Sequence, residues 1–376
     1  MMGSKPSSSP PPPQPKPFLC PTDYASFSDW QLKNTLKTQG VDTVYTDRDS
    51  LIAAVRSLPP QRNLSLIRRE IQGLLQDRNH DDGSYVPLLI RFAWHNSGTY
   101  DHTTNTGGCN GGTMRFQAEQ NDPENAGLKK AIHLLEPLHD KYPFLSHSDI
   151  WILAGYVAIE SSGGPYIQFA TGRLEMTDVE AEEKYGPSKC PFGDGLANNP
   201  SGSRLPAADL GPITSPPPGC PYHKKEFGPT IDATRGVFTR LGLSDKETVC
   251  LILLGHQYGR GHLENSGYEH PWYTFDPTHW SAYEGGLGYL SLYSNGVAPG
   301  RMSSRVTSKG KRQFEFHFGG GEPFMMLPVD VALWHDESYQ AHVKYYDRNR
   351  RSFKKDSGVA FKKLTELGCS NLVAEV

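Results

Sequence analysis

Residues 88–101 read LLIRFAWHNSGTYD, an apolar run interrupted by three polar side chains of different chemistry. On a helix, Arg91, Trp94 and His95 fall at positions i, i+3 and i+4, so that a cation, an indole N–H and an imidazole share one face. The triplet alone also fits a structural helix with a half-buried Trp–His pair and a solvated Arg. The run therefore predicts a helix over about residues 85–97, with a candidate site on one face.

A second stretch, residues 253–272, reads LLGHQYGRGHLENSGYEHPW. Ser244 and Glu247 match a capping box, which predicts the start of a helix that runs towards His256. His256 falls on the apolar face of that helix, where a single histidine is more often a satisfied core residue than a ligand.

Three shorter segments are unremarkable when each is taken alone. Residues 107–116 read GGCNGGTMRF and residues 121–128 read NDPENAGL, which is typical of a turn followed by a helix start. Residues 325–330 read MMLPVD, and a Met-Met-Leu run is ordinarily core filler.

Together and in this order, the five segments resemble the class I, intracellular haem peroxidases, and most of all the cytochrome c peroxidase branch. The resemblance covers roughly residues 64–367. It implies a mainly α fold of about ten helices in two lobes that enclose one haem b, with a few short strands. It also implies an enzyme that reduces hydrogen peroxide to water through an oxoferryl intermediate.

The resemblance also implies roles above the haem. His95 would act as the general acid–base towards peroxide, and Arg91 would stabilise the charge on the departing oxygen. Trp94 would lie beside them on the same face. Asn125 would hold His95 in one tautomer.

Below the haem, the resemblance implies that His256 is the iron ligand and that Asp330 accepts the other ring N–H of that histidine. Trp272 corresponds to an indole that can hold a cation radical beside this pair. The positions that the resemblance places against the haem or its propionates are Arg260, His262, Asn265, Ser266 and Leu327.

The electron donor stays open between cytochrome c and a small aromatic molecule. Ascorbate-specific relatives have Arg where this chain has Asn265, and the positions of their potassium ligands are occupied here by Gln257, Tyr273, Phe275 and Trp280, a poor ligand set for a hard cation. Bulky Tyr273 and Phe275 follow Trp272 where cytochrome c peroxidase has small residues, and His270 stands where the family has Gly. Tyr273 or Trp280 would serve as relays for a small donor. A haem sensor without catalysis is a third alternative.

Composition excludes several other classes. The net charge of −3 over 376 residues suggests neither nucleic acid nor an anionic membrane as a partner. The six cysteines form no C-x-x-C pair, so we expect no structural zinc site and mostly free thiols. Only Cys190 and Cys220 are close enough in sequence to suggest a disulfide.

The chain divides into a Ser/Pro-rich leader and extension (1–46), a peroxidase domain (47–370) with insertions at about 180–229 and 285–324, and a tail (371–376). The leader lacks the apolar core of a signal peptide and the arginines of a mitochondrial presequence, so we expect a cytoplasmic protein, with mitochondria as the alternative. Further predicted helices span 47–58, 64–75, 125–138, 148–159 with a Ser148 cap, 231–241, 336–353 and 359–367, and residues 313–318 predict a strand.

Overall fold

The structure is a computed structural model, and it describes residues 29, 33, 47–57, 64–143, 145–177, 180, 204–208, 227–272, 278–280, 302–317, 321–370 and 372–374. The chain divides into two units, residues 1–63 and residues 64–376. The leader, most of the first insertion, and both Cys190 and Cys220 lie outside the described residues. The disulfide therefore stays a prediction.

In the first unit, the described residues form helix α2 (Arg48–Ser57). Asp47 starts the helix, because its carboxylate accepts the backbone N–H of Ser50 at 2.8 Å. The helix predicted over residues 47–58 is confirmed.

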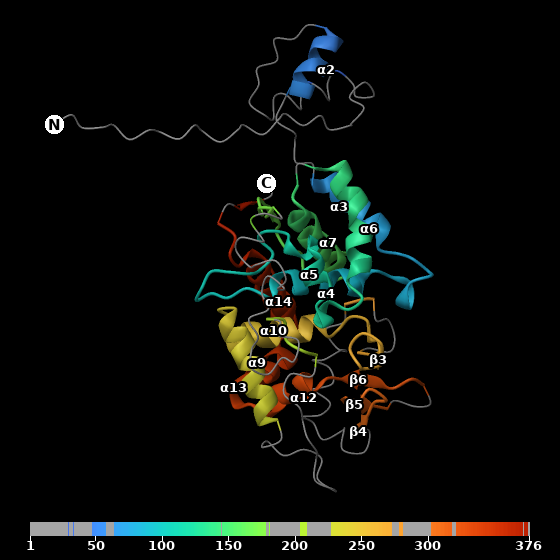
Figure 1. The fold of residues 1–376 in the computed structure, drawn as a ribbon, viewed down its shortest axis with the longest axis vertical. Helices are drawn as coiled ribbons and strands as arrows, with labels where there is room; N and C mark the ends of the chain where they lie inside the picture. The colour runs from blue at the N-terminus through green and yellow to red at the C-terminus, as the bar shows by residue number, and fades with distance from the viewer. Residues whose placement is uncertain are drawn as a thin grey trace, which may run out of the picture. The chain divides into compact units, whose positions relative to one another are not determined.

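The second unit is mainly α, with short strands (Figure 1), which confirms the predicted class. The helices of its N-terminal half gather in one part of the unit, and the later helices and strands in the other. The α-helices are α3 (Leu64–Leu74), α4 (Val86–Ser97), α5 (Gln117–Gln120), α6 (Lys129–Lys141), α7 (His147–Ser161), α9 (Gly228–Arg240), α10 (Asp245–Gly255), α12 (Pro328–His335), α13 (Glu337–Arg348) and α14 (Arg350–Glu366).

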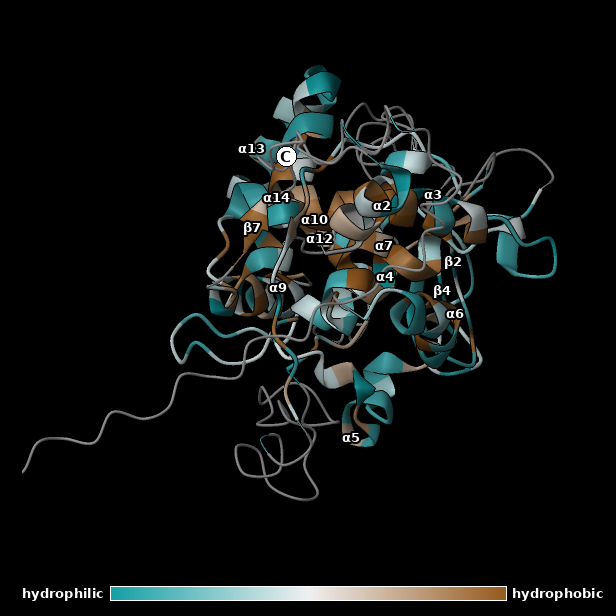
Figure 2. Ribbon diagram, turned by 90° about the horizontal axis from the view of Figure 1, so that it is seen from above, coloured by the Kyte–Doolittle hydropathy of each residue, from teal (hydrophilic) through white to brown (hydrophobic). Residues whose placement is uncertain are grey.

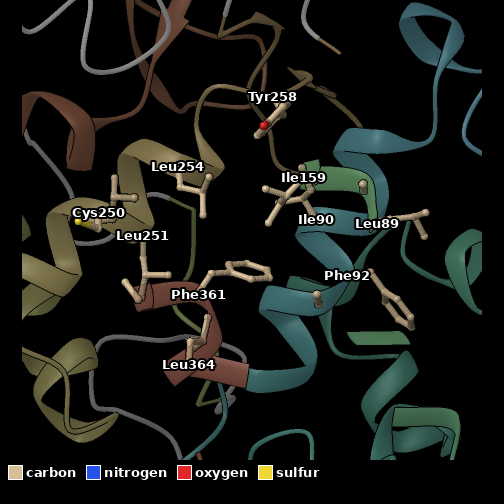
Figure 3. Close-up of a cluster of buried hydrophobic side chains, with 14 of the residues drawn as sticks. Leu89, Ile90, Phe92, Ile159, Cys250, Leu251, Leu254, Tyr258, Phe361 and Leu364 are labelled. Carbon is tan, nitrogen blue, oxygen red and sulfur yellow. The ribbon is translucent and has the colours of Figure 1, made fainter. Parts of the chain in front are cut away.

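Helix α7 lies at the centre of this unit, since every residue from His147 to Ile159 is buried. Figure 2 shows the hydrophobic residues gathered on the inner helices, whereas α13 is largely hydrophilic. In Figure 3, Phe361 of α14 points into the space between Leu251 and Leu254 of α10 and Ile90 of α4. Helix α14 thus helps to hold the two site-bearing helices, α4 and α10, in one core.

The strands form small antiparallel sheets. β4 (Met302–Val306), β5 (Arg312–Phe316) and β6 (Phe324–Met326) make one sheet, which confirms the strand predicted near residues 313–318. β2 (Arg260–Gly261) pairs with β3 (His270–Pro271), and β1 (Ala170–Thr171) pairs with β7 (Val373–Ala374) near the C-terminus. Strand β6 runs directly into α12, so the sheet fixes where that helix begins.

Several predicted helix boundaries are wrong. Helix α7 is capped by Ser146, whose Oγ accepts the Asp149 N–H at 3.0 Å, whereas Ser148 Oγ donates to the Cys109 carbonyl. Helix α6 begins at Lys129 instead of residue 125, because residues Pro123–Asn125 form a 3-10 turn and Gly127 has a φ of 81°.

Towards the C-terminus, the helix predicted over 336–353 ends at Arg348, and Asn349, with a φ of −129°, separates it from the long α14. Helix α12 was not predicted, because its apolar residues show no helical period. No helix among the described residues is long and apolar enough to cross a membrane.

Candidate active site

Helix α4 carries the first group of candidate residues. His95 is buried, and its Nδ1 lies 2.9 Å from Oδ1 of Asn125. Trp94 stacks on Phe238 of α9, with 5.7 Å between ring centroids. The i, i+3, i+4 spacing therefore places the three polar residues on one helix, and tertiary contacts hold His95 and Trp94 there.

Asn125 is held by the loop that precedes α6. Asp122 caps the 3-10 turn by accepting the Glu124 N–H, and the Asn125 side-chain amide donates to the Glu119 carbonyl at 2.8 Å. With its N–H group committed to Glu119, the amide of Asn125 presents its oxygen to the histidine. His95 Nδ1 therefore carries the proton, and Nε2 is left as the acceptor.

Arg91 binds the same loop. Its guanidinium donates to the carbonyls of Glu124 at 2.7 Å and Ala126 at 2.9 Å. Burial lowers the pKa of Arg91 to about 10, so the side chain remains a cation at neutral pH.

The same surroundings keep His95 neutral. Burial first, and then the charge of Arg91, lower the pKa of His95 well below 6.5, although the bond to Asn125 acts in the opposite direction. An uncharged imidazole with a free Nε2 can accept a proton at neutral pH.

Glu119 was not predicted as part of this group. Its carboxyl is buried, and one of its oxygens has no hydrogen-bond partner among the described residues. Burial raises the pKa of Glu119 to about 7. A single Glu in residues 117–120 gives no signal in the sequence, because only the folded loop buries it beneath Asn125.

The second group lies at the end of α10. His256 is the C-cap residue of this helix, and its Nδ1 lies 2.6 Å from Oδ1 of Asp330. Asp330 is fully buried, and its other oxygen accepts the backbone N–H of Leu327 at 2.8 Å. Asp330 thus caps α12 from position N3 and holds His256 at the same time.

Trp272 stacks on His256, with ring centroids 5.0 Å apart and ring planes inclined by 25°. Its indole N–H is buried and has no hydrogen-bond acceptor among the described residues. Trp272 therefore lies beside the His–Asp pair and makes no hydrogen bond to the Asp330 carboxylate, whose second oxygen accepts the Leu327 N–H.

Of the remaining predicted residues, Arg260, His262, Asn265 and Ser266 lie in the hairpin after α10, and two of these, Arg260 and His262, have acidic partners. His262 Nε2 lies 2.5 Å from Asp81, and Arg260 pairs with Asp82 and Glu322. Ser266 Oγ contacts the His262 carbonyl at 3.3 Å.

His270, which stands where the family has Gly, has a φ of 80°, in the region that favours glycine. Its ring Nδ1 lies 3.0 Å from Glu322.

Close backbone contacts bring the two groups together. A Cβ atom on Gly259, three residues after His256, would lie 2.6 Å from Pro87 in the first turn of α4. A Cβ atom on Gly127 would lie 2.8 Å from the amide of Asn265. Glycine is therefore required at both points, where the segment after α10 meets α4 and the Asn125 loop.

The residues near Trp272 are only partly described, since Tyr273 and Phe275 lie outside the described range. The Gln257 side-chain amide donates to the Leu253 carbonyl, and Trp280 stacks on Phe353.

The segment 204–208 packs on the end of α4, where Leu205 lies 3.1 Å from the Cβ position of Gly98.

His95 and His256 each have one ring nitrogen fixed and the other available, as haem chemistry requires. Each has its Nδ1 fixed by an oxygen, and neither Nε2 has a hydrogen-bond partner among the described residues. A metal-ligating histidine characteristically donates its other ring N–H to a carboxylate, which is the arrangement of His256 and Asp330. These residues fit a haem with His256 as the iron ligand.

Comparisons with known proteins identify a family and several relatives. The family model "Peroxidase" matches residues 67–349. A protein of Aspergillus fumigatus named "Cytochrome c peroxidase, mitochondrial" is 36% identical over 295 residues, which cover 78% of this chain and 67% of the relative.

A protein of the same name from Emericella nidulans is also 36% identical over 295 residues, with 78% and 68% of the two chains covered. Another Aspergillus fumigatus protein, named "Putative heme-binding peroxidase", is 36% identical over 302 residues, 80% of either chain.

Proposed function

The chain belongs to the peroxidase family, and we propose that it takes the electrons for peroxide reduction from reduced cytochrome c. It is an enzyme, a haem peroxidase, which removes the alternative of a sensor without catalysis. The observation that carries the residue assignment is the buried Asp330 bound to Nδ1 of His256, with Nε2 left free.

We assign His256 as the residue that would hold the haem iron, through Nε2. Asp330 gives the imidazole anionic character and thereby makes it a stronger ligand. Bound haem supplies an iron that accepts peroxide and takes up its two oxidising equivalents. Five residues stay predictions as haem contacts: Arg260, His262, Asn265, Ser266 and Leu327. Arg260 and His262 would then bind the haem propionates in addition to their acidic partners in the protein.

With haem bound, His95 would take the proton from the first peroxide oxygen at Nε2 and return it to the departing oxygen. Such acid–base catalysis contributes about 10²–10⁴-fold in rate. Arg91 supplies positive charge to the departing oxygen, an effect worth roughly 2.7–4 kcal/mol for comparable donors. Trp94, stacked on Phe238, lies on the same face of α4 as Arg91 and His95.

Cytochrome c as the donor is supported by the names of two relatives and by the stacking of Trp272 on His256. Electrons would enter through this indole. The small aromatic donor is the second candidate, and the indole N–H without an acceptor favours it, because no described carboxylate is bound there to stabilise a radical cation.

The test compares donors on the haem-loaded enzyme. Trp272→Phe should leave the first reaction with peroxide unchanged and impair turnover with ferrocytochrome c, while Trp334→Phe on α12 serves as the matched control. Turnover by the wild type with a phenol but not with ferrocytochrome c would overturn the proposed donor. Normal cytochrome c turnover in Trp272→Phe would overturn the route through the indole.

The cytoplasmic location expected from the leader stays a prediction. The relatives named as mitochondrial support the alternative for this chain. Cell fractionation followed by detection of the protein in the mitochondrial or the cytosolic fraction distinguishes the two.

A further inference from the structure

A second group of histidines and carboxylates lies outside the active site, where α6 ends and α7 begins (Figure 1). Glu136 and His139 are at i and i+3 on α6, and His147 is the first residue of α7. One ligand atom from each of these three side chains lies within 4.8 Å of the others. Such spacing lets three side chains reach one ion.

His147 is oriented by a carboxylate. Its ring Nδ1 lies 2.6 Å from Oε1 of Glu175, which also accepts the backbone N–H of His147. The other ring nitrogen, Nε2, is 3.5 Å from Oε1 of Glu136. Because Nδ1 donates to Glu175, Nε2 carries the lone pair and points towards the other members of the group, as in carboxylate–histidine–metal arrangements.

His139 completes the set. Its ring stacks on that of His147, with 3.5 Å between centroids, and its Nε2 is 3.8 Å from Glu175. Neither ring nitrogen of His139 has a hydrogen-bond partner within the described part of the chain. The side chains of His139 and Glu136 are 20% and 47% exposed, so they can adjust to an ion without disturbing the core.

The surroundings hold Glu175 in its orienting position. Arg115 lies 4.0 Å from its second oxygen, and the adjacent backbone bridges to Gly111. Glu175 is thereby held by Arg115 and by its own backbone as well as by His147. It acts as a positioning residue for the ring and leaves Glu136, His139 and His147 as the three ligands.

We propose that Glu136, His139 and His147 bind a divalent cation of the zinc type, with Glu175 orienting His147 and water in the fourth position. Two imidazoles and one carboxylate form a set that Zn²⁺ accepts in tetrahedral geometry, whereas Mg²⁺ prefers oxygen ligands in an octahedron. The site is independent of the haem and of the electron donor.

The location gives the ion a structural role. His147 contacts Trp151 at 5.5 Å, and Trp151 contacts Phe92 of α4 at 5.1 Å, as centroid distances. A cation that joins α6 to the first turn of α7 would therefore stabilise the helix that supports α4. Because the ion binds the folded chain only, zinc should raise the unfolding temperature.

The test is calorimetric titration of the chelator-treated, haem-loaded full chain with Zn²⁺ and separately with Mg²⁺. We expect one zinc site, no comparable magnesium binding and a zinc-dependent rise in unfolding temperature. His139→Gln and Glu136→Gln should each weaken zinc binding at least about 100-fold, and Glu175→Gln should weaken it about 10–100-fold. His133→Gln, an exposed histidine on the same helix, is the matched control and should bind like the wild type.

The absorbance of bound haem and the turnover with peroxide check that each variant is folded. Absence of zinc binding by the wild type would overturn the proposal. Unchanged affinity in folded His139→Gln and Glu136→Gln would also overturn it, since the ion would then bind elsewhere.

Discussion

His95 and His256 are oriented through the same ring nitrogen but by different groups. Each ring has its Nδ1 fixed by a side-chain oxygen and its Nε2 left free, but the oxygen belongs to a neutral amide in Asn125 and to a buried carboxylate in Asp330. The amide fixes the tautomer without adding charge, and burial with Arg91 keeps the pKa of His95 low. The carboxylate adds electron density to the ring. One ring is thereby suited to move a proton and the other to bind a metal.

The largest expected effect comes from removing the proton carrier. His95→Leu should leave the haem absorbance intact and slow the reaction with peroxide by at least about 10²-fold, because no other base takes its place. Stopped-flow absorbance measures this rate. His133→Gln is the control, and unchanged kinetics in His95→Leu would remove the acid–base assignment.

In Asp330→Asn, His256 meets an amide oxygen, as His95 does in the wild type. The amide keeps the size of the side chain and loses its charge, so we expect about a 10–100-fold loss in haem affinity or peroxide turnover. Haem titration and steady-state assays measure the two quantities. A variant equal to the wild type in both would show that the carboxylate charge is unimportant.

Asn125→Asp is the reciprocal change. A carboxylate beside His95 stabilises the imidazolium and raises the pKa of His95, so the ring stays protonated up to a higher pH. The wild type should lose its peroxide reaction only well below pH 6.5, whereas the variant should lose it at higher pH and recover in alkaline buffer. The pH profile of the second-order rate measures both, and coincident profiles would contradict the role given to Asn125.

The smallest effect on catalysis is expected from a change at Glu119, because this residue affects the stability of the fold. Its pKa in the folded protein, about 7, lies above the ordinary 4.5, so its protonated form stabilises the fold fully below pH 4.5 and this contribution is lost as the pH rises through 7. This shift in the pKa of Glu119 corresponds to about 3 kcal/mol in the free energy of unfolding at most. Glu119→Gln should therefore be more stable than the wild type at pH 8 and differ little at pH 4.5.

Thermal unfolding of both proteins at the two pH values measures this difference. Peroxide turnover at neutral pH should stay within a few-fold of the wild type. Parallel pH dependences of the two unfolding temperatures would show that Glu119 is ionised in the folded state.

Much of the fold could be predicted from local patterns. The Ser244–Glu247 capping box and the apolar spacing in residues 64–75 gave helices that the structure contains, because caps and periodicity act within a few residues. The local pattern predicts Ser148 as the cap of α7, whereas Ser146 caps it; either serine fits the pattern, and only the contact of Ser148 with Cys109 separates them. The sequence does not predict helix α12, because its apolar residues show no helical period and its start follows strand β6.

The candidate site divides in the same way. The sequence by itself determined that Arg91, Trp94 and His95 share a helix face and that His256 ends an apolar helix, because both follow from spacing along one element. Spacing within one element does not say which oxygen each histidine meets, since the partners are 30 and 74 residues away; the family resemblance named Asn125 and Asp330, and the tertiary structure brings them to the two rings. It alone also brought Glu175 to His147 and buried Glu119, because long-range packing, unlike helical periodicity, leaves no repeating pattern in the chain.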